Sequence, residues 1–501
     1  MGRQDEIVKE RLKKLGEMRA ERINPYPHKY VIGNYSSELQ EKYKSLKNNE
    51  KTKESAKIAG RIMGIRDIGK IIFVVVHDAT GKIQVTLQEK ETPDEVIKFF
   101  KKYADEGDFF GFEGDVFRTQ RGELSILVKK AEILSKSILP LPDKWHGLED
   151  KEERYRKRYL DLLMNPEVRN TFILREKIIS AIREFMKLHG FVEVDTPYLQ
   201  SVYGGAEARP FKTHLNSLDI DLFLAISPEL YLKRLIVGGF DKVFTIARNF
   251  RNEGIDKWHN PEFTMIEFYQ AYADYNDMME IFESIYEYAC RKVFGTTKIK
   301  HGDVVLDFKK PWKRMTMAEA IQKFAKIDVL KMDAKELLDF ADENHVEYRE
   351  KSWGALVAAV FEHFCEKELI QPVFITDHPK ETTPLCKIHR KDARLIERFE
   401  PFCMGAELGN AYSELNDPLL QKKLLEEQQE KLKKGNEEAN PYDADFVNAL
   451  EVGMPPTGGV GIGIDRMIIL LASQPSIRDV ILFPFMKPEA EEKGKAENRK
   501  K

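Results

Sequence analysis

The most constraining feature of the sequence is a β-hairpin with an unusually charged loop. Residues 242–250 and 263–272 are rich in β-branched and aromatic side chains, which favour strands. Gly254 and the pair Asn260-Pro261 mark turns between these strands. Guanidinium groups bind phosphate oxygens well, so the loop predicts a site for an anionic ligand such as a nucleoside triphosphate. The ionisable side chains of the loop are Arg251, Glu253, Lys257 and His259.

The second strand of the hairpin carries a carboxylate among apolar neighbours. Alternate residues of a strand face the same side, so Phe263, Met265, Glu267, Tyr269 and Ala271 share one face. An unpaired buried carboxylate is costly, and buried charges are normally paired. Two interpretations remain open: Glu267 pairs with an arginine in the core, which is the commoner case, or it awaits a cationic substrate.

The hairpin resembles motif 2 of the class II aminoacyl-tRNA synthetases, in the form that the lysine-specific branch of that family carries. The match runs from Phe250 to Tyr269, through Phe-Arg-Asn-Glu-Gly, His-Asn-Pro-Glu-Phe-Thr and Glu-Phe-Tyr, and continues in Ala-Tyr-Ala-Asp-Tyr at residues 271–275. An extended match of this kind is far more specific than a short glycine motif.

Two further segments resemble the same family. A helix over residues 171–189 followed by a strand over 191–197 that ends at a proline is similar to motif 1, which implies a homodimer formed through the catalytic domain. Residues 453–470, with closely spaced glycines and then Asp465-Arg466, are similar to motif 3. The resemblance covers about residues 55–486.

The first part of the chain predicts a small β-barrel. A surface helix over residues 5–22 and a polar helical stretch to about residue 56 precede five short strands. The strands are expected over residues 59–66, 71–77, 83–88, 108–119 and 123–134, a number and length that fit an OB fold. The fold class is therefore α+β: an N-terminal OB-fold barrel, then a class II synthetase catalytic domain built on an antiparallel sheet with flanking helices. The expected divisions are a helical extension (1–56), the anticodon-binding OB domain (57–140), a linker with a basic, solvated helix face (141–160), the catalytic domain (161–486) and a charged, disordered tail (487–501).

The resemblance implies which residues form the site. Arg251 and Arg466 are the catalytic residues, which contact the α- and γ-phosphates of ATP. The ATP-binding residues are Arg251, Glu253, His259, Asn260, Phe263, Glu400, Glu407, Gly461 and Arg466. The lysine-binding residues are Gly205, Glu229, Arg251, Glu267, Tyr269, Asn410, Tyr412 and Glu414. Glu400 and Glu407 hold Mg²⁺, and Phe73, Gln84 and Glu123 read the anticodon.

Simpler explanations exist for several of these residues. Gly205 could form only a tight corner, and Glu229 could stabilise the first turn of a helix. Phe73 could be barrel core. The carboxylates between residues 400 and 414 could form an acidic surface edge. In a regular strand Glu407 and Asn410 would point to opposite faces, unless Gly409 forms a bulge.

The implied activity is ATP-dependent ligation of L-lysine to tRNA(Lys) through a lysyl-adenylate. The alternatives are a catalytically silent RNA-binding or scaffold protein on the same fold, a sister aspartyl or asparaginyl ligase, and a lysyl-transferase that modifies a protein. Lysyl-transferases of that kind lack an anticodon barrel, whereas this sequence predicts one. A silent copy has no need of Arg251, Arg466, Glu400 and Glu407 together.

Composition sets the remaining expectations. A net charge of −3 excludes a uniformly basic nucleic-acid binder, so RNA contacts must come from local patches. The four cysteines form no Cys-x-x-Cys pair, which favours free thiols in a reducing compartment. No apolar run approaches the roughly 20 residues of a membrane span, and the first residues lack the apolar region of a signal peptide. We therefore expect a cytoplasmic protein without membrane contact.

Overall fold

The computed structural model describes residues 3–142, 148 and 150–489, which belong to two compact units, 1–149 and 150–501. Parts of the predicted linker (141–160) and of the predicted charged tail (487–501) lie outside the described residues.

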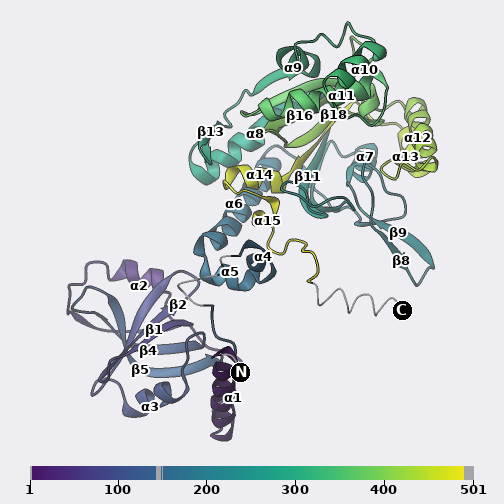
Figure 1. Ribbon diagram of the computed structural model, residues 1–501. Coiled ribbons are helices and arrows are strands. Elements are labelled where there is room, and N and C mark those ends of the chain that lie inside the picture. Colours follow the sequence, from purple (N-terminus) through teal and green to yellow (C-terminus); the bar gives the residue numbers. More distant parts are fainter. Residues whose placement is uncertain (1–2, 143–147, 149, 490–501) are drawn as a thin grey trace. The chain divides into compact units, whose positions relative to one another are not determined.

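The first unit is the predicted OB-fold barrel. Its five strands close in the order β1-β2-β3-β5-β4, in which all neighbours are antiparallel except β3 and β5 (Figure 1). Inward-facing residues such as Val74, Val85 and Phe112 are fully buried. The elements are α1 (Arg3–Ala20), α2 (Ser36–Lys42), β1 (Lys51–Asp67), β2 (Ile71–His77), β3 (Lys82–Gln88), α3 (Asp94–Tyr103), β4 (Phe109–Arg118) and β5 (Leu124–Ser135).

The predicted polar helical stretch up to residue 56 is only partly present, because between residues 21 and 56 the chain is helical only in α2. Residues 51–56 open the long strand β1, where Ser55 and Ala56 pair with Asp115 and Gly114 of β4. This part of β1 is mostly exposed, so its residues are polar on both faces. They therefore lack the alternation of apolar and polar residues that predicts a strand.

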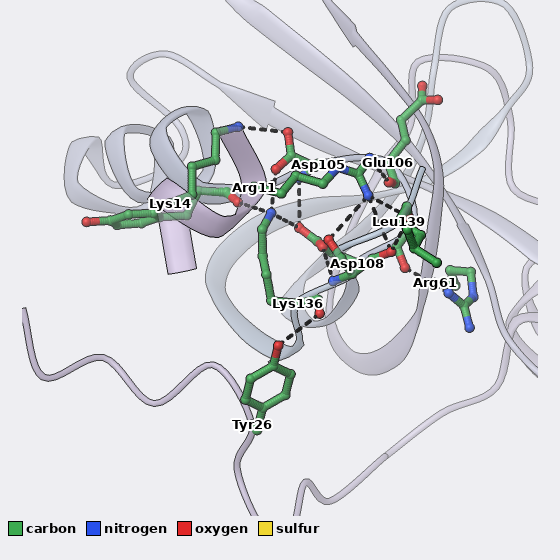
Figure 2. A network of polar contacts seen from close by, with 12 residues as sticks. Arg11, Lys14, Tyr26, Arg61, Asp105, Glu106, Asp108, Lys136 and Leu139 are labelled. Atoms are coloured by element: carbon green, nitrogen blue, oxygen red, sulfur yellow. Dashed lines mark hydrogen bonds and ion pairs between the residues drawn. The ribbon is translucent and has the colours of Figure 1, made fainter. Parts of the chain in front are cut away.

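Helix α1 is fixed to the barrel by a polar network (Figure 2). Arg11 donates from Nη2 to the Glu106 carbonyl at 2.7 Å and from Nη1 to the Leu139 carbonyl at 3.0 Å. Beside it, the fully buried ammonium of Lys136 lies 2.7 Å from Asp108 and 2.5 Å from Asp105. These contacts satisfy charges that burial would otherwise penalise.

The second unit is built on a mixed sheet of order β14-β15-β16-β18-β19-β11-β10-β6, with β17 paired to β16. The predicted antiparallel arrangement holds from β15 to β10, whereas the end pairs β14·β15 and β10·β6 are parallel. The strands are β6 (Val192–Glu193), β10 (Lys242–Phe250), β11 (Glu262–Ala271), β14 (Lys313–Thr316), β15 (Val373–Pro379), β16 (Leu395–Cys403), β17 (Ala406–Glu407), β18 (Gly409–Ser413) and β19 (Thr457–Gly463).

Helices cover this sheet on both faces. One face carries the main core, in which Phe268 and Ile266 of β11 pack with residues of α6, α8 and α14. On the other face Tyr269 and Ala271 pack with residues of α7 and α13, beside the site described below. The helices are α4 (Lys151–Arg156), α5 (Arg158–Met164), α6 (Pro166–Leu188), α7 (Glu229–Val237), α8 (Tyr275–Phe294), α9 (Met317–Phe324), α10 (Ala334–Glu343), α11 (Trp353–Phe364), α12 (Pro418–Lys433), α13 (Ala444–Val452), α14 (Ile464–Leu471) and α15 (Ile477–Val480). Smaller sheets comprise β7 (Leu199–Gln200), β8 (Lys212–Leu215) and β9 (Ile220–Leu224), and β12 (Lys298–His301) with β13 (Val304–Asp307).

The basic run before α6 is solvated only in part, because Lys157 is exposed and Arg158 is buried. Residues 151–164 form α4 and α5, and Arg158 is 1% exposed. Its guanidinium pairs with Asp161 at 2.6 Å and donates to the carbonyls of Leu482 and Arg478 at 2.9 and 2.8 Å. Within the described residues, no helix combines the length and apolarity needed to cross a membrane.

Candidate active site

A cavity of about 340 Å³ opens on the sheet face opposite the main core, along β11, β18 and β19. Every residue predicted above to bind ATP, lysine or magnesium lies on its wall. The sequence patterns therefore converge on one site, although they span more than 250 residues of the chain.

Strand parity explains which side chains reach the cavity. Phe263, Met265, Glu267 and Tyr269 line it, as predicted, while Ile266 and Phe268 point into the main core. The neighbouring strand β19 presents glycines to the cavity. A Cβ on Gly459 would overlap both the Glu414 carboxylate and the Tyr269 ring, so only glycine leaves room there.

Glu407 and Asn410 reach the same cavity because the strand is interrupted between them. Leu408 separates β17 from β18, and its N–H donates to the carbonyl of Pro401 at 2.7 Å. A Cβ on Gly409 would overlap the carbonyl oxygen of Gly461. The irregularity expected near Gly409 is thus present, and it places Glu407 on the cavity wall.

Gly205 and Glu229 lie together at one end of the cavity. Gly205 has a φ of +88°, so the tight-corner explanation also holds for it. A Cβ there would lie 2.8 Å from Cβ of Glu229 and 2.9 Å from Oγ of Ser227. The turn therefore brings its backbone against the groups that a substrate would contact.

Glu267 is buried without a counter-ion. It is 3% exposed, accepts a hydrogen bond from Oγ of Ser227 at 2.9 Å, and lies 3.4 Å from the Tyr269 hydroxyl. Among the residues that the structure describes, no cation forms an ion pair with it, so the core-arginine interpretation is wrong. Burial raises the pKa of Glu267 to about 8, with a further contribution from the charge of Glu229.

The other two carboxylates share a lysine that the sequence analysis did not identify. Nζ of Lys233 lies 2.6 Å from Glu229 and 2.5 Å from Glu414, and its side chain is fully buried. Burial alone would lower the pKa of Lys233, but the two carboxylates outweigh it and raise that pKa, so the ammonium is charged. Burial raises the pKa of Glu414, against the opposing charge of Lys233. The sequence signal was the spacing of four residues between Glu229 and Lys233 on a helix.

The hairpin loop presents a cation without a partner. Nε of Arg251 is buried and donates to no hydrogen-bond acceptor within the described chain, and its guanidinium lies 5.1 Å from the centre of the Phe263 ring. Burial lowers the pKa of Arg251. Oδ1 of Asn260, nearby on the cavity wall, is also buried without a partner. The unpartnered donor of Arg251 fits a bound anion, whereas Oδ1 of Asn260 can only accept a hydrogen bond and fits a donor group of the same ligand.

The loop also meets the segment that resembles motif 3. Arg466 donates from Nη1 to the Glu407 carbonyl at 2.6 Å, and its Nη2 lies 3.1 Å from Nε2 of His259. Nδ1 of His259 lies 2.8 Å from Asp256, which orients the imidazole. Arg466 and His259 therefore face the same part of the cavity.

A third arginine of the cavity wall, Arg398, connects the remaining predicted groups. Arg398 forms an ion pair with Glu400 and donates from Nε to Oδ1 of Asn410 at 2.9 Å. Asn410 in turn lies 2.5 Å from the Tyr412 hydroxyl. Within residues 3–142 and 150–489, no group of three or more His, Cys, Asp or Glu side chains is arranged to hold a metal ion.

The predicted anticodon residues lie on the barrel. Phe73 and Gln84 are half-buried and point outward from adjacent strands, whereas Ile72, Val74 and Val76 form the core, so the core interpretation of Phe73 is wrong. Nε2 of Gln84 donates to Oγ of Ser125 at 2.7 Å. Glu123 is exposed in the turn between β4 and β5.

Comparisons with known proteins agree with this arrangement. Residues 150–487 match the family described as tRNA synthetases class II (D, K and N), and residues 56–134 match the OB-fold nucleic acid binding domain. The chain is 50% identical to a lysine–tRNA ligase of Methanoculleus marisnigri over 95% of this chain and 94% of that protein. It is 49% identical to lysine–tRNA ligase 2 of Methanosarcina mazei (96% and 94% covered) and to a lysine–tRNA ligase of Carboxydothermus hydrogenoformans (97% and 98% covered). The chain therefore belongs to the class II tRNA synthetase family of the D, K and N group.

Proposed function

We propose that this chain ligates L-lysine to tRNA(Lys) at the expense of ATP, through a lysyl-adenylate. The observation that carries the proposal is the buried, unpaired carboxylate of Glu267 on a cavity wall that also holds Arg251. A desolvated carboxylate is costly until a cation neutralises it, and the substrate supplies that cation.

The charge of the pocket suits lysine in particular. Glu229, Glu267 and Glu414 carry three negative charges when ionised, and Lys233 neutralises one of them. The remaining two match the two ammonium groups of free lysine. Aspartate or asparagine would bring no second ammonium, and aspartate would add a like charge, so the sister ligases fit this pocket poorly.

The unpaired groups of the hairpin loop support ATP binding beside the lysine pocket. Arg251 would contact the α-phosphate, Arg466 the γ-phosphate, and Phe263 the adenine ring. His259, Asn260, Glu253 and Gly461 complete this side of the cavity. All of these roles rest on the geometry of the wall and on the likeness to the family.

In this reaction the protein positions the lysine carboxylate and ATP and supplies no nucleophile of its own. The lysine carboxylate oxygen attacks the α-phosphorus, the bond to the bridging oxygen breaks, and pyrophosphate leaves. A ribose hydroxyl of tRNA then attacks the carbonyl carbon of the adenylate, and AMP leaves. Arg251 would neutralise the charge that develops on the α-phosphate, a form of electrostatic stabilisation that needs no covalent chemistry from the protein.

Glu400 and Glu407 fit a magnesium ion. Mg²⁺ usually takes one or two protein carboxylates together with substrate phosphates and water, and both carboxylates line the cavity. Each now pairs with an arginine, Arg398 or Arg466, which holds the carboxylate in place. A bound magnesium ion would neutralise phosphate charge.

The barrel would bind the anticodon. Phe73 offers an aromatic surface for base stacking, and Gln84 and Glu123 offer hydrogen-bonding groups beside it. A barrel of this kind also argues against a lysyl-transferase that modifies proteins.

A homodimer through the catalytic unit is part of the proposal. The short strand β6 lies at the end of the sheet, and large apolar side chains are exposed on it and on β7 and β9: Val192 (46%), Leu199 (52%) and Ile220 (41%). Exposed apolar surface of this kind favours association. The molar mass in solution, from light scattering, tests it.

We also expect the protein to work in the cytoplasm. Its four cysteines, Cys290, Cys365, Cys386 and Cys403, are all buried free thiols, which a reducing compartment preserves. Localisation of a tagged chain in its own cell checks this expectation.

The test is ATP–pyrophosphate exchange without tRNA, run with each amino acid separately, followed by transfer to tRNA. We expect exchange with lysine alone. Exchange with aspartate or asparagine would move the chain to a sister activity, and folded protein that exchanges with none of them would support the silent RNA-binding alternative.

A further inference from the structure

One polar side chain on the cavity wall has no partner and no role so far. Asn440 lies in the segment between α12 and α13, is 3% exposed, and lines the cavity. Neither Oδ1 nor Nδ2 has a hydrogen-bond partner among the described residues, and both atoms are buried. Leaving such groups unsatisfied costs roughly 1–3 kcal/mol each, so a buried amide with both ends free calls for a ligand.

The position of Asn440 restricts what that ligand can be. Its Oδ1 lies 3.6 Å from where a Cβ of Gly204 would be, so the amide lies over the glycine turn. The next residue of that turn, Gly205, packs against Ser227 and Glu229. Asn440 therefore lies at the Glu229 end of the cavity.

The amide also has two different free ends. Oδ1 can only accept a hydrogen bond and Nδ2 can only donate one. A side-chain ammonium of lysine would satisfy Oδ1 and leave Nδ2 without a partner. The α-ammonium and α-carboxylate of an amino acid offer a donor and an acceptor side by side, which satisfies both ends.

We propose that Asn440 binds the α-ammonium and α-carboxylate of the amino-acid substrate and is a specificity residue for the free amino-acid head group. This inference rests on the proposed function, since it takes lysine to be the substrate. It adds a contact from the α12–α13 segment to a site that the hairpin and the sheet otherwise form.

Lysine-driven ATP–pyrophosphate exchange tests the inference when 6-aminohexanoate is added as an inhibitor. This compound retains the carboxylate and the side-chain ammonium of lysine but lacks the α-ammonium. For Asn440→Ala we expect KM for lysine to rise roughly tenfold or more, as for loss of a hydrogen bond to a charged group. The KM for ATP should not change, and Ki for 6-aminohexanoate should rise much less than KM for lysine.

A matched control comes from the same segment. Asn436 is exposed and outside the cavity, so Asn436→Ala should leave all three constants unchanged. The near-isosteric variant Asn440→Leu separates binding from folding. Because the amide has no partner in the empty protein, this variant should unfold at the same temperature as wild type or higher, whereas a structural role predicts a lower one.

Equal increases for lysine and 6-aminohexanoate would overturn the inference, because Asn440 would then contact only groups that the two compounds share and not the α-ammonium. Unchanged constants in both variants would also overturn it and would leave the proposed function standing. Absence of lysine-driven exchange in the wild-type protein would instead remove the proposed function itself.

Discussion

Replacing Glu267 with glutamine should stabilise the empty protein at high pH while abolishing its response to lysine. The pKa of Glu267 rises from 4.5 to about 8 on folding because the carboxyl is buried. A carboxyl with a raised pKa carries a folding penalty that is absent below pH 4.5 and complete above pH 8. At roughly 1.36 kcal/mol per pH unit, this shift corresponds to a penalty of about 5 kcal/mol.

The glutamine amide of the variant offsets part of the stability that is gained when this penalty is removed. Its NH₂ group has no acceptor and costs roughly 1–3 kcal/mol, which leaves a net stabilisation of roughly 2–4 kcal/mol at pH 9. For residues 150–501 unfolding together, at roughly 2.1 cal/mol/K per residue, this corresponds to a melting temperature higher by roughly 3–5 °C. At pH 5 Glu267 is neutral, so the variant should be no more stable than wild type.

Differential scanning fluorimetry at pH 5, 7 and 9, with and without saturating lysine, measures both effects. Lysine should raise the melting temperature of wild type and not that of Glu267→Gln. A variant that is less stable than wild type at pH 9, or that still responds fully to lysine, would refute the view that this carboxylate is held without a partner for a cationic substrate.

Four other substitutions separate the parts of the site. Gly459→Ala places a methyl group on the Glu414 carboxylate, so KM for lysine should rise at least roughly tenfold in the exchange assay while KM for ATP stays constant; an unchanged lysine KM would contradict the geometry. Lys233→Met breaks a buried ion pair at a cost of about 3–5 kcal/mol and should lower the melting temperature by several degrees, and a neutral effect would show that this lysine is not the counter-ion. Arg251→Met should lower kcat of exchange by about 100-fold with little change in melting temperature, since its Nε has no protein partner; near-normal kcat would exclude it from the α-phosphate. Phe73→Ala should leave exchange unaltered and weaken tRNA binding by roughly 1–3 kcal/mol, and equal tRNA affinity in a filter-binding assay would remove the stacking role.

The sequence was most informative where a local pattern had a single physical meaning. Alternation along residues 263–271 identified the cavity face of β11, and the glycines of β19 marked the place where the backbone must leave room for a ligand. The same patterns could not decide the state of Glu267, because pairing depends on which distant side chains approach it. Its hydrogen-bond partners, Ser227 and Tyr269, carry no positive charge.

Contacts between distant segments were the least predictable. The sequence predicts a solvated charge at Arg158, although the side chain binds carbonyls more than 300 residues away, which no local pattern records. Asn440 gave no signal at all, since a polar residue in a loop is ordinarily exposed. Lys233 could have been found from its spacing to Glu229, whereas its pairing with Glu414 required the fold.

The central claim is that lysine binds by ionising a carboxylate that the empty pocket keeps protonated. Titration calorimetry of lysine at pH 7, in two buffers with different ionisation enthalpies, counts the protons released on binding. With the pKa of Glu267 at about 8, the account predicts release of about one proton per lysine by wild type and a clearly smaller release by Glu267→Gln. Binding without proton release, or with the same release in both proteins, would contradict it.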